Sequence, residues 1–242
     1  MDRRTVSTAL PRGPRASLER SEADGFSALE VLAEGTGAWL SHLPAYAGIA
    51  LLLHAPLALL LLLPPLPHGV VAAILVVAGF FVALLVKAAV VKAVIDARRT
   101  LPTDFLELLE ALRGAPKVLV LGARILARAA ARSVLLLVPG LLYLTETFAA
   151  VPALIIEGGS MRASMRRSEQ LTGGVRMQVL GVCLLIWTVA VGLMLFSGLH
   201  RGGNVGSVTW IAVYLCTRAL DTSLAAVLSA TTYHHLCERD VG

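Results

Sequence analysis

Charged side chains are scarce in this chain of 242 residues. They make up 15% of the sequence, whereas apolar residues make up 57% and the mean hydropathy is +0.77. Soluble globular domains carry about 25% charged residues, and disordered chains are richer in charge and poorer in apolar residues. The composition therefore excludes a soluble enzyme and a disordered protein, and it indicates one membrane domain.

Aromatic side chains are also few, at 5% of the sequence. Lys and Arg outnumber Asp and Glu, 21 to 16, which gives a net charge of +5. The basic residues collect between apolar runs and form no stripe with interleaved aromatic residues, which is the pattern that nucleic-acid binding requires. We therefore expect no nucleic-acid partner and read the basic residues as signals of membrane orientation.

Cysteines number only three, so no disulfide framework can be read from them. Cys183 and Cys216 fall in apolar runs, and Cys237 follows His234 and His235. Adjacent histidines on a helix point about 100° apart, and no second pair of ligands is visible, so we expect no metal site. Phosphate-binding loops, nucleophile elbows and zinc-protease motifs are missing as well. The chain is expected to have no cofactor and no enzymatic activity.

Long apolar runs are abundant, and they predict an all-α polytopic membrane protein. A bilayer core about 30 Å thick is crossed by about 20 apolar residues in a helix. Unbroken runs also exclude a β-barrel, whose strands would alternate in hydropathy. The predicted spans number six: Leu43–Leu63, Gly69–Val94, Lys117–Val138, Leu141–Ile156, Met177–Leu199 and Ser207–Leu228.

The distribution of basic residues predicts the orientation. The three short connections, at 64–68, 139–140 and 200–206, hold only Arg201, whereas the other side holds 16 Lys and Arg, with Lys87 included in that count. By the positive-inside rule, both termini are expected in the cytoplasm. The membrane itself is expected to be the inner membrane of the cell. The predicted organisation is a disordered arm (1–24) without the features of a signal peptide, a membrane domain (25–238) and a tail (239–242).

Amphipathic stretches precede the spans on the charged side, and we expect them to lie on the inner leaflet. Each is followed by a glycine, and Gly35-Thr36-Gly37 is interpreted as a turn. The three stretches are Phe26–Leu32, Phe105–Leu112 and Met161–Leu171, followed by Gly35, Gly114 and Gly173.

The segment from Val138 to Gly174 resembles the membrane domain attached to some bacterial glycerophosphoryl diester phosphodiesterases, which also occurs alone. The chain's ending at Tyr233 to Leu236 is similar to the Tyr-x-x-Leu with which such domains often end. The resemblance implies six spans and a membrane location. The catalytic chemistry of those proteins lies in a separate domain, so it does not transfer. The matching residues are Pro139, Gly140, Phe148, Pro152, Glu157, the run 163–167, Ser168, Leu171, Thr172 and Gly174.

The same segment has a direct physical reading. Pro139-Gly140 breaks a helix where the chain reverses, and Gly158-Gly159 ends the fourth span. Ser160 then caps a basic surface helix. On this helix three arginines are expected to face lipid phosphates while Met161, Met165 and Leu171 enter the acyl boundary. The arginines are Arg162, Arg166 and Arg167, and the simpler reading is that they only enforce topology.

A second set of charges lies within the predicted spans. Arg124, Arg128 and Arg132 recur every four residues and form one ridge, which either faces protein partners or water, or places this segment partly in the interface. Glu146 is the predicted partner of Arg132. The set is completed by Arg218 and Asp221, which are three residues apart and are predicted to pair within their own helix. Together these six residues form the predicted interior charge cluster, either as a structural network or as a cavity for an anionic group.

These patterns favour a non-enzymatic membrane protein that binds anionic membrane lipid or assists an envelope process. The alternative is a small transporter or permease subunit in which the arginine ridge lines the path of an anion or lipid. Protein partners cannot be read from the sequence.

Overall fold

The computed structural model describes residues 26–61, 68–98, 112–135, 137–201 and 207–241, and within these ranges the chain is helical without a strand. The predicted all-α fold is therefore confirmed. The helices are α2 (Ala28–Ser41), α3 (Leu43–Leu61), α4 (His68–Arg98), the short 3₁₀ turn η1 (Leu112–Gly114), α6 (Ala115–Leu135), α7 (Leu137–Glu146), α8 (Ala150–Glu157), α9 (Met161–Thr172), α10 (Arg176–Arg201) and α11 (Ser207–Val241).

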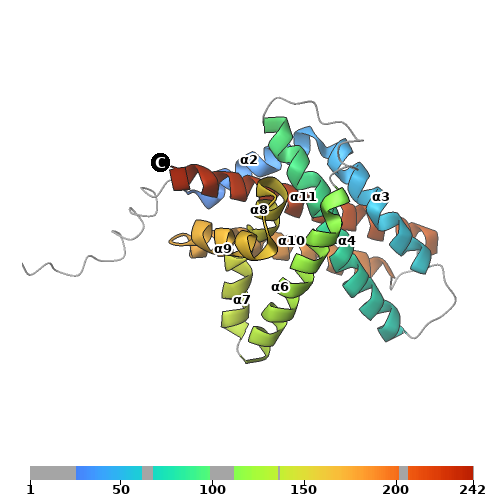
Figure 1. Ribbon diagram of the computed structural model, residues 1–242. Helices are drawn as coiled ribbons and strands as arrows, with labels where there is room; N and C mark the ends of the chain where they lie inside the picture. The colour runs from blue at the N-terminus through green and yellow to red at the C-terminus, as the bar shows by residue number, and fades with distance from the viewer. Residues whose placement is uncertain (1–25, 62–67, 99–111, 136, 202–206, 242) are drawn as a thin grey trace, which may run out of the picture.

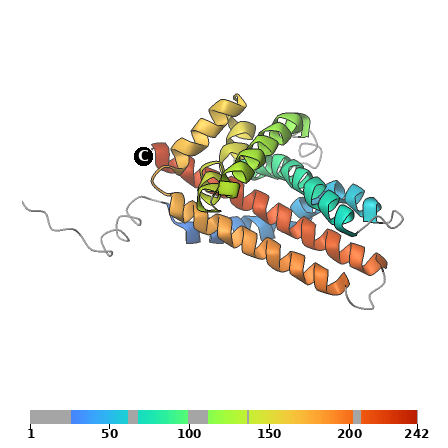
Figure 2. The same ribbon diagram turned by 90° about the horizontal axis from the view of Figure 1, so that it is seen from below.

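The long helix α11 is the centre of the fold, and α2, α3, α4 and α10 all pack against it. Figure 2 shows α10 and α11 lying side by side over most of their length. Small side chains along α11, among them Ala219, Ser223, Ala226 and Ala230, are buried. Small residues let neighbouring helix backbones approach closely, which is how helices associate in a membrane.

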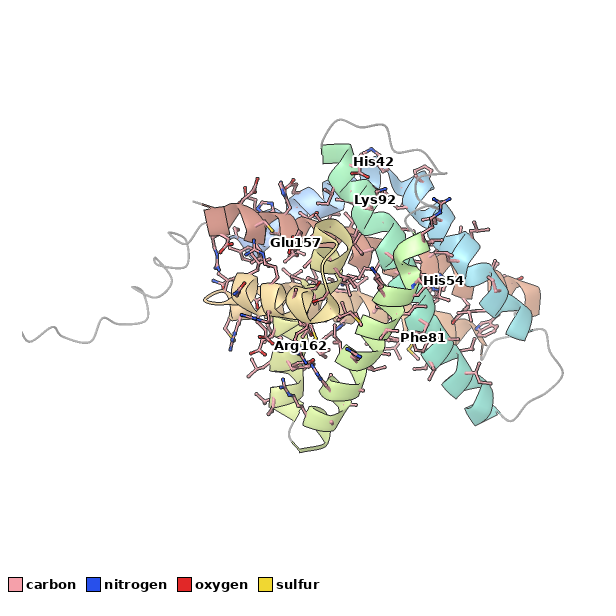
Figure 3. All side chains as sticks on the ribbon, in the orientation of Figure 1. His42, His54, Phe81, Lys92, Glu157 and Arg162 are labelled. Carbon is pink, nitrogen blue, oxygen red and sulfur yellow. The ribbon has the colours of Figure 1, made fainter. Side chains whose placement is uncertain are left out.

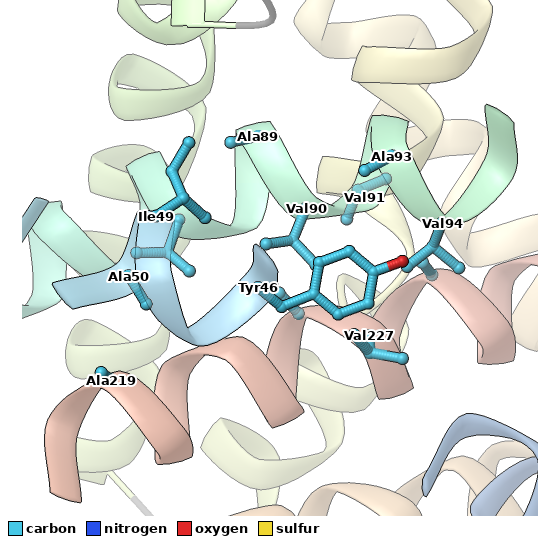
Figure 4. Packing of buried hydrophobic residues seen from close by; sticks show 13 residues of the cluster. Tyr46, Ile49, Ala50, Ala89, Val90, Val91, Ala93, Val94, Ala219 and Val227 are labelled. Carbon is cyan, nitrogen blue, oxygen red and sulfur yellow. The ribbon is translucent and has the colours of Figure 1, made fainter. Parts of the chain in front are cut away.

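The largest hydrophobic core lies where α3, α4 and α11 meet (Figure 4). The Tyr46 ring is buried beside Val90 and Val94 of α4 and Val227 of α11. Because valine and alanine dominate this core, the three helices interlock through short, stiff side chains.

Four helices of the described part are long and apolar enough to cross a membrane, and a fifth crossing is possible if α2 and α3, bent by 80°, act as one. The polytopic membrane fold is thus supported, with four or five such helices instead of the six predicted. The four are Ile74–Ala97 in α4, Val138–Glu157, which runs through α7 and α8, Arg176–Phe196 in α10 and Thr209–Asp240 in α11.

Two predicted spans are missing from these four: α3, which passes only together with α2, and α6, which does not pass at all. The 21 residues of α6 include Lys117 and the three arginines of the ridge, and no acidic residue offsets them. In both ribbon views α6 runs across the direction of α10 and α11 and not alongside them (Figures 1 and 2). The charge of α6 therefore outweighs its apolar residues, and the prediction of a span at Lys117–Val138 is not supported.

The interpretation of Gly35-Thr36-Gly37 as a turn is wrong, because α2 continues through these residues to Ser41. A Cβ atom on Gly35 would lie 2.7 Å from Leu228 Cδ2 of α11. Gly35 thus serves the close approach of two helices. Its signal resembles that of a helix end because both uses require the absence of a side chain.

The turn between α8 and α9 agrees with the sequence interpretation. Gly158 has φ 67° and ends α8, and Ser160 Oγ accepts a hydrogen bond of 3.2 Å from the Ala163 amide, capping α9. The Pro139-Gly140 reversal is displaced, because α6 ends at Leu135 and both residues already belong to the first turn of α7. Proline is tolerated there because first-turn amides have no partner within the helix.

Some predictions fall outside the described residues, namely the arm 1–24 and the amphipathic helix Phe105–Leu112, of which only Leu112 is described. Helix α11 continues through the predicted tail (239–242) as far as Val241. The sixth predicted span therefore belongs to a helix that extends well beyond Leu228.

Candidate functional site

Helix α9 is held against the protein by a face of small polar residues. Ser164, Ser168, Leu171 and Thr172 are buried, and Ser168 Oγ donates a hydrogen bond of 2.5 Å to the carbonyl oxygen of Glu146. Because these residues are three or four positions apart, they share one side of the helix. The signature residues Ser168, Leu171 and Thr172 thus attach α9 to the rest of the molecule.

The signature residue Glu157 joins three helices. Its Oε1 atom accepts hydrogen bonds from the Tyr233 hydroxyl, at 2.7 Å, and from Arg167 Nε, at 3.2 Å. Arg167 Nη1 also contacts Asp240 Oδ2 at 2.7 Å. We call Glu157, Arg167, Tyr233 and Asp240 the carboxylate latch, since together they tie α8 and α9 to α11.

The latch corrects the expectation for Arg167. The hydrogen bond to Asp240, followed by that to Glu157, raises the pKa of the Arg167 guanidinium above its usual value. Arg167 is paired with two carboxylates of the protein, Glu157 and Asp240. It therefore differs from Arg162 and Arg166 and is not one of three equivalent lipid-facing arginines. One sequence feature points to this cluster, because Tyr233 begins the Tyr-x-x-Leu ending on which the resemblance is partly based.

Arg239 fixes the other end of α9. Its Nη2 atom donates to the carbonyl oxygens of Leu171, at 3.1 Å, and of Gly173, at 2.7 Å. A cation at a helix C-terminus satisfies carbonyl groups that lack a partner and complements the helix dipole. Gly174, with φ 85°, then turns the chain toward α10. The sequence predicts for Arg239 only a place among the 16 basic residues of the cytoplasmic side.

The remaining two arginines of α9, Arg162 and Arg166, are exposed. The expectation that Met161, Met165 and Leu171 enter lipid is wrong. The two methionines pack against a core formed by α4, α6 and α8, and Leu171 is buried in another core. Because the apolar side of α9 is covered by protein, its basic side is the one left to face outward.

The arginine ridge of α6 lies next to α9. Arg124, Arg128 and Arg132 are exposed, and Arg128 Nη1 is 3.7 Å from Met165 Sδ. Figure 3 shows Arg162 on this side of the molecule, between α9 and α6. The two helices thus meet at Arg128 and Met165. We call their exposed arginines the basic surface, which consists of Arg124, Arg128, Arg132, Arg162 and Arg166.

The predicted pair of Arg132 and Glu146 is wrong. The Arg132 guanidinium lies 4.1 Å from the centre of the Tyr143 ring, and Glu146 Oε1 contacts Arg176 Nη1 of α10 at 3.0 Å. The predicted pair depends on Arg132 and Glu146 being equally far along the chain from a reversal at Pro139-Gly140. The observed reversal precedes Pro139, so the register between the two helices differs from the one assumed.

The pair of Arg218 and Asp221 is confirmed, with Nη1 and Oδ2 3.1 Å apart on α11. Both residues line one pocket together with Lys87, which belongs to α4 and not to a connection between helices. Lys87 was detectable as a lone ionisable residue within an apolar run. The interior charge cluster therefore consists of Lys87, Arg218 and Asp221, and it excludes the α6 ridge and Glu146.

His234 and His235 bind carboxylates on different helices. His234 Nε2 lies 3.2 Å from Glu238 Oε1, and His235 Nε2 lies 2.6 Å from Glu34 Oε2 of α2. Within the described ranges, no group of three or more His, Cys, Asp or Glu side chains is placed to hold a metal ion.

No protein-family model, curated protein or solved structure matches this chain. The resemblance to the membrane domain of the phosphodiesterases stays a prediction. Of its remaining residues, Pro152 and Gly140 are buried, Phe148 is partly buried and Pro139 is exposed.

Proposed function

We propose that this chain is a non-enzymatic protein of the bacterial inner membrane that binds anionic lipid headgroups through the basic surface of α6 and α9. The observation that carries this proposal is that exposed arginines of α6 and of α9 lie on two helices that meet where Arg128 contacts Met165. The apolar side of α9 is covered by protein, so its arginines are left to face outward. Each cationic side chain near an anionic membrane surface contributes about 1 kcal/mol of attraction.

In this proposal α6 is an interfacial helix and not a span. A single arginine at the bilayer centre costs at least about 2.5 kcal/mol, and α6 carries three without an acidic partner on the same helix. An amphipathic helix lying in the headgroup region removes that cost, since all three arginines then reach phosphates. The transporter alternative is less well supported, because its ridge would have to line an interior path.

The orientation proposed for the chain has both termini in the cytoplasm. Lys92 of α4 and Lys117 of α6 line one small cavity of about 310 Å³ together with Gly158, which ends α8. Arg239, near the end of α11, contacts the end of α9, and Glu157 at the end of α8 contacts both of these helices. Basic residues that gather at one end of a bundle favour its cytoplasmic placement.

The experiment compares two variants of equal net charge. Arg162→Gln with Arg166→Gln removes two charges from the basic surface, whereas Ala33→Glu with Thr36→Glu lowers the net charge equally on the exposed side of α2. Phosphatidylglycerol and cardiolipin that co-purify with each protein are counted by native mass spectrometry. We expect the arginine variant to lose anionic lipid, with attraction weakened by about 2 kcal/mol, and the α2 variant to retain it. Equal lipid counts in the wild type and the arginine variant would refute the proposal.

A further inference from the structure

A cavity of about 310 Å³ lies between α4, the α6–α7 hairpin, α8, α10 and α11. Most of its lining is apolar and includes Phe80, Ile125 and Trp187. Pockets for small molecules have this character, with an apolar lining and a few polar groups placed to orient the ligand. The cavity is separate from the basic surface, whose arginines do not line it.

Three charged side chains, on α4 and α11, reach the cavity. Arg218 and Asp221 pair with each other at 3.1 Å, so their charges cancel. The Lys87 ammonium lies 4.9 Å from the centre of the Phe148 ring, and it makes neither a hydrogen bond nor an ion pair with any residue of the described ranges. The cavity therefore holds one net positive charge.

An ammonium inside an apolar bundle is costly without a counter-ion, and a contact with an aromatic face compensates only part of that cost. The observed side chains supply no anion for Lys87, because the one carboxylate of the cavity already binds Arg218. A ligand with an anionic group would supply it. The apolar lining is suited to an aliphatic chain attached to that group.

We propose that this cavity binds a single-chain anionic amphiphile, with its carboxylate or phosphate on Lys87 and its chain against the apolar residues around Trp187. This site is independent of the basic surface, which would bind headgroups from outside. Loss of either site leaves the other intact, so the two proposals fail separately.

Trp187 provides a reporter inside the cavity. The chain has three tryptophans, so Trp39→Phe with Trp210→Phe leaves Trp187 alone, and Trp39→Phe with Trp187→Phe leaves Trp210 as the control. Bromine quenches tryptophan fluorescence on contact. The full chain in phosphatidylcholine nanodiscs is titrated with 11-bromoundecanoate and, separately, with 11-bromoundecanol, which has the same chain without the charge.

We expect saturable quenching of Trp187, but not of Trp210, by the bromo acid. Lys87→Met should weaken that binding about tenfold or more, which is the loss typical of a hydrogen bond to a charged group. Lys92→Met, on the exposed side of the same helix, should leave it unchanged. The alcohol should quench Trp187 weakly and without saturation.

A second pair of variants tests the cavity without altering its charge. Ala190→Phe fills the space beside Trp187, whereas Ala212→Phe adds the same volume at an exposed position of α11. The first should abolish saturable quenching and the second should retain it, with unfolding followed by circular dichroism for both. Equal quenching in the Lys87 and Lys92 variants, or by acid and alcohol, would overturn the proposal. Displacement of the bromo acid by equimolar acetate would identify a site for small anions and overturn it too.

Discussion

Helices α6 and α11 both carry arginine within largely apolar segments, but their surroundings differ. On α11, Arg218 lies three residues from Asp221 inside a bundle of four neighbouring helices. On α6, three arginines follow one another without an acidic residue and are exposed. An arginine is thus accommodated within the bundle where its charge is paired locally, whereas the row of arginines without an acidic residue lies on the surface of the protein.

Breaking the α11 pair is expected to have the largest effect. Asp221→Leu leaves Arg218 without its partner and should lower the free energy of unfolding by about 3 kcal/mol. This value is at the low end for a buried pair because the Arg218 side chain is 25% exposed. The double variant Arg218→Met with Asp221→Leu should be milder than the single one. Denaturation in mixed micelles measures both, and equal losses would show that the pair is not coupled.

Two glycines on α2 test how tightly the α11 bundle is packed. An added Cβ at Gly35 meets Leu228 at 2.7 Å, whereas one at Gly37 meets nothing within 4 Å. Alanine gains up to about 1 kcal/mol of helix propensity over glycine, but overpacking costs 1–3 kcal/mol. We therefore expect Gly37→Ala to be about 2 kcal/mol more stable than Gly35→Ala. Thermal unfolding compares the two, and equal stability would contradict the close packing.

The carboxylate latch joins the α11 bundle to α9, and adjacent arginines on α9 test it. Arg167→Gln removes two partly exposed ion pairs and should cost about 1 kcal/mol, whereas Arg166→Gln should change stability by less than about 0.5 kcal/mol. High salt should reduce the difference, because it screens exposed charges. If the two variants unfold alike at low salt, the latch contributes nothing to stability.

The smallest effect on stability is expected on α6. Arg128→Gln should change the free energy of unfolding by less than about 0.5 kcal/mol, since the side chain is exposed and its described polar contact is a weak one with Met165 Sδ. The same change should still weaken the attraction to anionic vesicles by about 1 kcal/mol. Flotation with vesicles of phosphatidylglycerol measures the second effect. A large loss of stability would place Arg128 in the packed interior instead.

Local features were predictable from the sequence. The cap at Ser160, the end of α8 at Gly158 and the pair of Arg218 and Asp221 each depend on residues within four positions of one another. Such interactions follow from helix geometry alone, because spacing along the chain fixes distance in space. The helical membrane class followed as directly from composition.

Contacts between helices were not predictable in the same way. The partner of Glu146 is Arg176, because the position of the reversal before α7 sets a register that the sequence does not state. Gly35 looked like a helix end because its neighbour, Leu228, is distant in the chain. Lys87 was counted with a connection although it lay within a predicted span, and giving priority to the span would have placed it inside the bundle.

The proposal that α6 lies in the membrane interface is tested by measuring the depth of α6 in a bilayer. Single cysteines at 124, 128 and 132 of α6, and at 184, 191 and 195 on the exposed side of α10, are spin-labelled in the full chain, with the native cysteines replaced by serine. Power saturation with oxygen and with a polar nickel complex gives the depth of each label. If α6 lies in the interface, all three of its labels should have one shallow depth, near the headgroups, while the α10 labels should change progressively in depth. A steady increase in depth from 124 to 132 would make α6 a membrane span and contradict the proposed lipid-binding surface.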